Sequence, residues 1–447
     1  MSKPIVFIGA SGAMCHMVVQ RLVKATPTPI VLADINTEPV EALHNSLPAN
    51  RATVLKLDLF NRAALTNAIN GAALVILGAG PYTRTAKPVI EACLAAKVPY
   101  LDFDDDVEST QAALELHDRA KQAGVAVFIG CGASPGLSNV IAMDATSQLD
   151  VVDSIELFWL VGNEKSGAGK AVIEHLMHIA SGPCLTWVDG KPQIVESYQE
   201  TKWAPMLGHS EIMLHETAHP EPTTLPKLFP QAHSIRCFGG LYPLAKFGCA
   251  RGLGNAVRRG ILPIEEAGDW QLKARHGELE PALGGQALLE LTEHFPQLKV
   301  GEKGAHLIQQ AQGAHQAGTH AVEGLVDQIR RGETTQEEAR DFLIEAAGLA
   351  EKIETAGALG VRVTGTRKGY PTVIVKRTPV GKDPVLMRTM ASVTGTACAA
   401  FALLALQAGQ GLSGVFCPEN WAEPQALYGA LESLGIEQEE LPETYVY

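Results

Sequence analysis

Residues 5–12 read Ile-Val-Phe-Ile-Gly-Ala-Ser-Gly, a short apolar run that ends in two closely spaced glycines. A fully apolar strand of this length is typical of a parallel sheet that is covered on both faces. Gly9 allows a tight turn after the strand, and Gly12 lets the N-terminus of the next helix approach an anion closely. The free N–H groups and the positive dipole end of that helix attract a pyrophosphate. The stretch therefore predicts the start of a dinucleotide-binding domain, with Gly9, Ser11, Gly12 and Ala13 against the cofactor.

A second apolar run ends at Asp34, which stands 22 residues after Gly12. At this place in a βαβ unit a carboxylate accepts hydrogen bonds from the adenosine ribose, and its charge repels a 2′-phosphate. Asp34 therefore favours NAD, with NADP as the alternative cofactor. The glycine pattern departs from the usual fingerprint, because Ser11 and Cys15 stand where two further glycines are common. An ordinary buried strand followed by a glycine turn is the competing interpretation.

The composition is that of an α/β enzyme without a nucleic-acid or membrane partner. The 447 residues carry a formal net charge of −13, whereas nucleic acids and anionic membranes attract basic surfaces. None of the eight cysteines belongs to a Cys-x-x-Cys pair, which favours reduced thiols. The first strand begins too early for a signal peptide, and the longest apolar stretch, residues 396–406, is too short to span a bilayer. We therefore expect a cytoplasmic protein.

Strands and helices continue to alternate up to about residue 150, as in a doubly wound parallel sheet. Ligands of such sheets bind at the carboxyl ends of the strands, where the loops 78–82 and 130–139 are expected. Asp58 ends the third strand, and its carboxylate would either bind the adenine amine or cap the helix expected over 62–69. The further residues expected to contact the cofactor are Gly78, Ala79, Gly80, Pro81, Pro135, Gly136 and Asn139.

The chain changes character after residue 150. Residues 151–260 contain alternating strands with prolines and tryptophans, which predicts an antiparallel sheet in a second domain. Residues 264–355 have a helical periodicity, and strands return at 360–366 and 372–377. The second domain is therefore expected to be of the α+β class.

Four segments, in this order, resemble the saccharopine dehydrogenase-like oxidoreductases, the family that includes saccharopine reductase and lysine 6-dehydrogenase. They are the turn at 9–12, Gly-Pro-Tyr at 80–82 followed by residues 89–93, Tyr-Leu-Asp at 100–102, and Gly-Ala-Ser-Pro-Gly-Leu-Ser-Asn at 132–139. Residues 414–420 are similar to the segment by which the family's chain returns to the nucleotide-binding domain.

The resemblance implies a Rossmann domain made of residues 1–145 and 390–447. Residues 146–389 would form the α+β substrate-binding domain, with a helical insertion around 264–355. It further implies a homodimer, which symmetry preferences also favour, and hydride transfer between a nicotinamide and the carbon of a C–N bond.

Three residues are the candidates for catalysis. Tyr82 and Ser134 follow strand ends, so that both can flank a nicotinamide, although the prolines beside them also suit ordinary turns. Asp104 lies in the acidic run 102–106, where mutual repulsion would raise the pKa of one carboxyl toward that of a useful base. Capping of the following helix is the competing role for this run.

An amino-acid substrate also needs a partner for its carboxylate. Arg236 and Arg251 bracket the Gly-Gly-Leu-Tyr-Pro segment at 239–243, and a guanidinium binds a carboxylate in a bidentate way that lysine cannot reproduce. They are the candidate substrate-binding residues, with ordinary surface arginines as the alternative.

Two further motif matches do not support a function. The stretch 215–219, His-Glu-Thr-Ala-His, has the spacing of a zinc-protease helix, but Pro220 follows at once and no third ligand is evident. Tyr242 and Lys246 have the Tyr-x-x-x-Lys spacing of short-chain dehydrogenases, but Pro243 interrupts it and the segment lies in the second domain. We expect no metal site.

These observations predict an NAD(P)-dependent oxidoreductase that acts on a C–N bond of an amino acid or related small amine. The reaction would be an oxidative deamination or a reductive joining of an amine and a carbonyl, and either one moves a proton on nitrogen. Two alternatives stay open. One is a catalytically silent dinucleotide sensor, since no obligatory acid or base stands out, and the other is a carbonyl or alcohol dehydrogenase.

Overall fold

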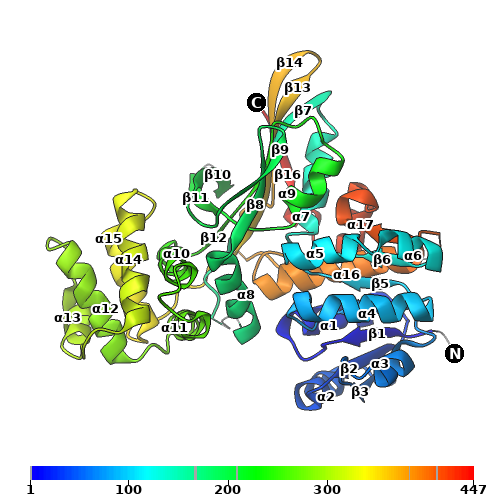
Figure 1. Cartoon of the computed structure of the whole chain (residues 1–447), viewed down its shortest axis with the longest axis horizontal. Coiled ribbons are helices and arrows are strands. Elements are labelled where there is room, and N and C mark those ends of the chain that lie inside the picture. The colour runs from blue at the N-terminus through cyan, green and yellow to red at the C-terminus, as the bar shows by residue number, and fades with distance from the viewer. Residues whose placement is uncertain (1–2, 166–168, 208–209, 382, 409–410) are drawn as a thin grey trace.

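The computed structural model describes residues 3–165, 169–207, 210–381, 383–408 and 411–447, which form two domains built on separate sheets (Figure 1). The nucleotide-binding domain, on the right in Figure 1, combines the N-terminal part of the chain with a segment near the C-terminus. The second domain holds a long sheet and, at the left, a group of helices.

The nucleotide-binding domain is a doubly wound α/β domain, as the sequence predicts. Its seven strands have the order β15-β6-β5-β4-β1-β2-β3 and pair in parallel. The central strands β1 and β4 are buried along their whole length, as expected where helices cover both faces. The strands are β1 (Ile5–Ile8), β2 (Ile30–Asp34), β3 (Ala52–Lys56), β4 (Leu74–Leu77), β5 (Tyr100–Asp102), β6 (Ala126–Phe128) and β15 (Gly414–Phe416). The helices are α1 (Ala13–Ala25), α2 (Thr37–Ser46), α3 (Arg62–Ile69), α4 (Tyr82–Ala96), α5 (Val107–Leu114), α6 (His117–Ala123), α7 (Leu137–Thr146), α16 (Met390–Ala408) and α17 (Pro424–Ser433).

The second domain is built on a nine-stranded mixed sheet. Seven strands follow the order β10-β11-β12-β7-β13-β14-β16, and β8 pairs with both β12 and β9. The prediction of a purely antiparallel sheet is wrong at β12 and β7, which run parallel because a long excursion separates them in the chain. The strands are β7 (Val151–Val161), β8 (Pro183–Val188), β9 (Lys191–Glu196), β10 (Thr201–Leu207), β11 (Ser210–Glu216), β12 (Ser234–Leu241), β13 (Ala358–Arg367), β14 (Tyr370–Arg377) and β16 (Glu443–Val446).

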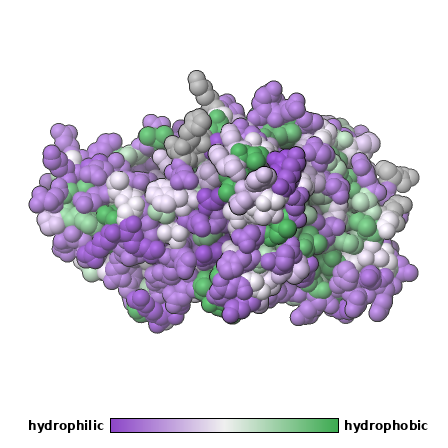
Figure 2. All heavy atoms as spheres, turned by 90° about the horizontal axis from the view of Figure 1, so that it is seen from above, coloured by the Kyte–Doolittle hydropathy of each residue, from purple (hydrophilic) through white to green (hydrophobic). Residues whose placement is uncertain are grey.

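Helices make up the rest of the second domain. A separate apolar core, which includes Phe247, Leu288, Leu325 and Phe342, holds most of them together. The outer surface at this end of the molecule is mostly hydrophilic, as the left side of Figure 2 shows. The helices are α8 (Lys170–Ser181), α9 (Glu221–Thr224), α10 (Ala245–Arg258), α11 (Ile264–His276), α12 (Pro281–His294), α13 (Gly301–Ile308), α14 (Gln316–Arg330) and α15 (Gln336–Ala346), and three short 3₁₀ helices lie at Leu225–Lys227, Pro418–Asn420 and Gln438–Glu440.

The C-terminal segment returns to the nucleotide-binding domain but does not end there. Helix α16 packs on α1, and β15 extends the parallel sheet beside β6. The last strand, β16, pairs instead with β14 of the second sheet. The expected assignment of all of 390–447 to the Rossmann domain is therefore wrong for the final strand, β16, which belongs to the second sheet.

Helix α16 is the one described helix that is long and apolar enough to cross a membrane by length and composition. It exceeds the apolar stretch expected from the sequence because small residues extend the helix on both sides. Within the structure, 67% of its most apolar window is buried. This degree of burial is typical of a core helix, and α16 packs on α1.

Cys15 and Gly78 show how the domain accommodates the irregular glycine pattern. Cys15, on α1, is buried, and its Sγ lies 3.7 Å from the carbonyl oxygen of Gly78 at the end of β4. A Cβ on Gly78 would stand 2.5 Å from that Sγ. The small residue that lets the helix and the sheet approach each other is therefore Gly78, directly after β4, and not a residue of α1.

This contact predicts a coupled pair of substitutions. Gly78→Ala should lower the free energy of unfolding by about 1–3 kcal/mol, the usual effect of overpacking. In Gly78→Ala/Cys15→Ala the loss should be smaller than the sum of the two single losses by at least about 0.5 kcal/mol. Urea unfolding measures all three variants. Gly80→Ala is the control, because a Cβ there would have no atom within 4 Å, and strict additivity of the pair would contradict the argument.

Candidate active site

A cavity of about 440 Å³ lies between the two domains at the carboxyl edge of the parallel sheet. The nucleotide-binding domain contributes the loops after β4, β5 and β6, and the second domain contributes β7, α8 and the loop before α9. This is the place where open parallel sheets bind their ligands. Much of the wall is apolar, and its members include Trp159, Leu241, Leu359, Met387 and Val393.

The turn after β1 has the form expected for pyrophosphate binding. Gly9 has φ +88°, and a Cβ there would stand 2.4 Å from the backbone nitrogen of Ala79, so only glycine fits. Gly12 and Ala13 are exposed at the start of α1, and no side chain caps the helix. Ser11 is half-buried beside them. The N-terminus of α1 is therefore open to an anion.

Asp34 ties this turn to the end of β2. Its Oδ2 accepts a hydrogen bond from the backbone N–H of Ser11 at 3.0 Å, and its Oδ1 accepts one from Asn36 at 2.9 Å. The carboxylate is thus fixed beside the pyrophosphate turn, where the sequence predicts the ribose contact.

Asp58 is exposed after β3, and its Oδ1 accepts from the backbone N–H of Phe60 at 3.0 Å. The alternative role of Asp58 as a helix cap is wrong, because Asn61 caps α3 by accepting from the N–H of Ala64. The adenine contact of Asp58 stays a prediction.

The loop after β4 forms one wall of the cavity. Gly78, Gly80, Pro81 and Tyr82 line it, and Ala79 lies half-buried against Gly9. The hydroxyl of Tyr82 donates to the carbonyl of Leu77 at 3.4 Å. Burial, followed by the charge of Asp102, raises the pKa of this hydroxyl well above its usual range. Tyr82 therefore shapes the cavity and is poorly suited to release a proton.

The loop after β6 meets the cavity only at two residues in its middle. Ala133 and Ser134 line the wall, whereas Pro135, Gly136 and Asn139 are buried behind it. Both polar atoms of the Asn139 side chain are hydrogen-bonded. Its Oδ1 accepts from the N–H of Gly136, and its Nδ2 donates to Glu419 at 2.8 Å. Direct cofactor contact by these three buried residues is therefore a wrong prediction; they hold the loop and the start of α7 in place.

The acidic run places different carboxylates at the cavity than the sequence predicts. Asp104 is buried away from the wall, and its Oδ1 accepts from the backbone N–H of Asp106. Burial, and then Asp102, raise its pKa well above the usual range. The catalytic role of Asp104 is wrong because the chain turns its side chain into the loop, and Asp105 and Asp106 line the cavity instead.

His175 of α8 lies between these two carboxylates and joins the domains. Its Nε2 is 3.1 Å from Asp105 Oδ2, and its Nδ1 is 3.0 Å from Asp106 Oδ1. Burial alone lowers the pKa of the imidazole, but the charges and hydrogen bonds of the two aspartates outweigh it and raise that pKa well above its usual value. Burial also tends to raise the pKa of Asp105, yet His175 and then His219 bring it below its usual value. The imidazolium and the two carboxylates form a charged cluster where α8 of the second domain meets the loop after β5.

Neither of the arginines expected to bind substrate lies at the cavity. Arg236 pairs with Glu216 and Glu200, at 2.5 and 2.7 Å. Arg251 is 1% exposed and pairs with Glu333 and Asp327, both at 2.9 Å. Both predictions are wrong, because carboxylates of the second domain already occupy these guanidinium groups.

Arg275 of α11 is the arginine that faces the cavity. It is 4% exposed, and its Nη2 is buried without a hydrogen-bond partner among the described residues. Burial lowers the pKa of the guanidinium, and Glu164 partly offsets this effect. The sequence contains no signal for Arg275, since it stands in an ordinary amphipathic helix.

The two motif matches have no catalytic form in the structure. Residues 210–216 are strand β11, so that the zinc-protease pattern is not helical; its first histidine pairs with Glu333. Tyr242 lies outside the cavity, and Lys246 is buried against Asn163 and Glu345. A Tyr-Lys pair of the short-chain dehydrogenase type is absent from the described cavity wall.

Comparison with known proteins supports the same family for fold and nucleotide site. Residues 5–128 match the sequence model described as the saccharopine dehydrogenase NADP binding domain. The whole chain is similar to saccharopine dehydrogenase (L-Glu forming) from Saccharomyces cerevisiae, with a TM-score of 0.62, 14% identity and 100% coverage of both chains. Residues 5–128 thus match the nucleotide-binding domain of the saccharopine dehydrogenase family, and the full chain has the fold of the yeast enzyme, so that the resemblance in the motifs is confirmed.

The curated relatives match less than a third of this chain. A putative trans-acting enoyl reductase of Mycobacterium tuberculosis is 29% identical over 132 residues, which are 29% of this chain and 32% of the relative. A trans-acting enoyl reductase of Mycobacterium ulcerans is 26% identical over 132 residues. These matches agree on a nicotinamide-dependent oxidoreductase family and differ in the bond that their names imply.

The charged cluster predicts a pH-dependent contribution to stability. The folded-state pKa of His175 is raised, so its contribution is complete below the unfolded value of about 6.5 and is lost as the pH rises through the folded value. The contribution of Asp105, whose folded pKa is lowered, is lost only as the pH falls through that lower value. His175→Gln should therefore destabilise by about 1–3 kcal/mol at pH 6, and by less at each higher pH up to 9.

Urea unfolding of the wild type and the variant across this pH range measures the difference. His178→Gln is the matched control, because His178 is half-exposed and lies 3.5 Å from Glu108; such a pair contributes at most about 1 kcal/mol. A difference that stays constant from pH 6 to 9 would show that His175 acts by packing rather than by charge.

Proposed function

We propose that the protein is an NAD-dependent oxidoreductase that acts on the C–N bond of a small amine carrying a carboxylate. The observation that carries the proposal is a single cavity lined by both positively and negatively charged side chains. Arg275 lines the cavity and has a buried Nη2 without a hydrogen-bond partner among the described residues, while Asp105 and Asp106 share a single imidazole. An amino-acid-like substrate has the complementary carboxylate and amine. The nicotinamide supplies hydride transfer when it is bound.

The choice between NAD and NADP depends on Asp34. The description of the family model names NADP, which favours the phosphorylated cofactor. In this chain the Asp34 carboxylate is fixed beside Ser11, where it opposes the charge of a 2′-phosphate. We propose NAD on this ground.

A reduction of a carbon–carbon double bond is the second candidate. The mycobacterial relatives are named enoyl reductases, and much of the cavity wall is apolar. Such a substrate would need no ammonium partner and no carboxylate partner, and it would leave the charged groups of the cavity without a role.

A thermal-shift and turnover assay tests the proposal. The full chain is titrated with NADH and NADPH, and then assayed with NAD⁺ and saccharopine, L-lysine or L-glutamate, and with NADH and crotonyl-coenzyme A. Cofactor-dependent oxidation of an amine supports the C–N proposal. Reduction of the enoyl thioester with no amine oxidation replaces it by the second candidate. Cofactor binding without any turnover favours a dinucleotide sensor.

The cofactor choice gives a prediction for Asp34→Asn. The variant keeps an acceptor oxygen for Ser11 and loses the charge, so the ratio of the dissociation constants for NADPH and NADH should fall about tenfold, or about 1.4 kcal/mol. Isothermal titration measures both constants. Asp118→Asn, an exposed aspartate of α6, should leave the ratio unchanged. A wild type that prefers NADPH would overturn the role given to Asp34.

The substrate site gives a prediction for Arg275→Met. The variant should raise KM for the carboxylated amine about 10–100-fold, the effect of losing a charge-assisted hydrogen bond, with the dissociation constant of NADH unchanged. It should not lower the melting temperature, because it removes an incompletely partnered buried charge. Arg119→Met, at an exposed pair with Glu91, is the control. An unchanged KM would exclude Arg275 as the carboxylate partner.

A further inference from the structure

Chemistry at a C–N bond needs a group that takes a proton from the substrate nitrogen and returns it. His175 is a poor candidate, because each of its ring nitrogens already faces a carboxylate. The hydroxyl of Tyr82 donates to a backbone carbonyl, and the hydroxyl of Ser134 donates to Glu221 at 2.6 Å. His178 is half-exposed and pairs with Glu108. One further imidazole lines the described wall, that of His219.

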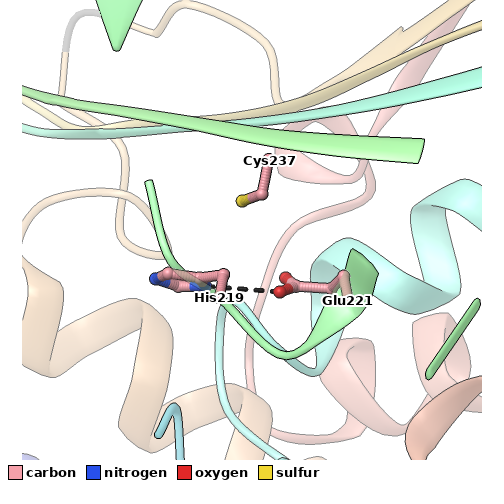
Figure 3. Close-up of side chains that lie close together, drawn as sticks. All are labelled: His219, Glu221 and Cys237. Atoms are coloured by element: carbon pink, nitrogen blue, oxygen red, sulfur yellow. Dashed lines mark ion pairs between the residues drawn. The ribbon is translucent and has the colours of Figure 1, made fainter. Parts of the chain in front are cut away.

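His219 lies in the loop between β11 and α9. It is 4% exposed, and its ring lies against Trp159, with centroids 5.5 Å apart and planes at 32°. Its Nδ1 faces Glu221 Oε2 at 3.3 Å. Figure 3 shows the second ring nitrogen, Nε2, on the side of the ring away from Glu221 and Cys237. One nitrogen therefore lies at ion-pair distance from a carboxylate, and the other is left for a ligand.

Glu221 fixes the imidazole in this orientation. The side chain is fully buried, and its Oε1 accepts from Ser134 Oγ at 2.6 Å and from Ser138 Oγ at 2.9 Å. Burial by itself raises the pKa of the carboxyl, but His219 and the Ser134 hydroxyl outweigh it and hold that pKa below its usual value. An ionised carboxylate at Nδ1 keeps the proton on that nitrogen, so that Nε2 is the basic one.

We propose that His219 exchanges the proton with the substrate nitrogen, and that Glu221 and Ser134 are its positioning residues. The inference rests on the C–N chemistry proposed above. As the amine carbon gives its hydride to the nicotinamide, the C–N bond becomes C=N, and the proton that leaves the nitrogen is taken up by Nε2 of His219. In the reverse direction Nε2 returns the proton as hydride adds to the imine carbon. The resulting imidazolium is stabilised by Glu221 and by Asp105, the second carboxylate that interacts with it.

A metal site made of His219, Glu221 and Cys237 of β12 is the competing interpretation. The Sγ of Cys237 and the donor atoms of His219 and Glu221 lie within 4.8 Å of one another (Figure 3), and such a set can bind zinc. The contacts favour the proton-transfer pair. Glu221 already satisfies two hydroxyls and the imidazole. Burial, followed by the charge of Glu221, raises the pKa of the Cys237 thiol well above its usual value, which opposes the thiolate that zinc requires.

Kinetics on the full chain test the proposal, with saccharopine, L-lysine and L-glutamate as the amine probes. His219→Asn keeps a donor near the position of Nδ1 and removes Nε2. It should lower kcat about 10²–10⁴-fold, leave the dissociation constant of NADH unchanged, and remove one limb of the pH profile of kcat. Glu221→Gln and Ser134→Ala should give smaller losses with an altered pH profile. His320→Gln, which removes an imidazole that pairs with Glu323 on α14 outside the cavity wall, should match the wild type.

Two measurements do not depend on turnover. In ¹⁵N-histidine NMR spectra, the imidazole that is missing from His219→Asn should carry its proton on Nδ1 in the wild type and lose this preference in Glu221→Gln. Metal analysis should find no stoichiometric zinc.

Three results would overturn the role of His219: a variant that retains kcat and the pH profile, a proton found on Nε2, or zinc that is lost in Cys237→Ser. A wild type that binds dinucleotide but oxidises no amine would instead refute the C–N proposal itself, and the proton role of His219 with it.

Discussion

The fully buried carboxylate of Glu221 holds the two domains and the candidate site in a fixed arrangement. A charge with no exposure to solvent is strongly destabilising unless donors surround it. Here one hydroxyl comes from the loop after β6 of the nucleotide-binding domain, a second comes from the start of α7, and one imidazole comes from the second domain. A movement of Ser134, of the start of α7 or of His219 would remove one or more of the partners of this carboxylate. The geometry of the cavity wall follows from that requirement.

The same logic applies at a second contact between the domains. His175 of α8 reaches across to Asp105 and Asp106, so that a second charged cluster fixes the substrate domain against the loop after β5. Because both contacts lie at the carboxyl edge of the parallel sheet, they enclose the space in which a nicotinamide and a substrate would meet. Charges that are held in a largely apolar cavity act more strongly than they would in water. The site is thus assembled by the domain interface rather than by either domain alone.

The parts of this structure that the sequence predicts are those governed by local rules. The strand before Gly9, the open helix start at Gly12 and the carboxylate at Asp34 each depend on residues a few positions apart, and the predicted doubly wound sheet follows from them. Several of the wrong predictions involve partners far away in the chain. Asn139 is bound by Glu419, 280 positions on. Arg251 is neutralised by Glu333, 82 positions on. No spacing rule identifies such pairs, because only the fold brings them together.

A buried charge at the cavity without an ion-pair partner among the described residues bears on the nature of the ligand. A buried guanidinium without a full set of partners costs stability, and most buried charges in this chain, such as Arg251 and Glu221, are paired. Arg275 keeps an unpartnered Nη2 at the wall of a cavity. Real proteins break such rules mainly at functional sites, where a ligand completes what the fold leaves open. A carboxylate that enters this desolvated place regains the whole hydrogen bond. Under the proposed function, Arg275 would therefore favour an anionic substrate over a neutral one.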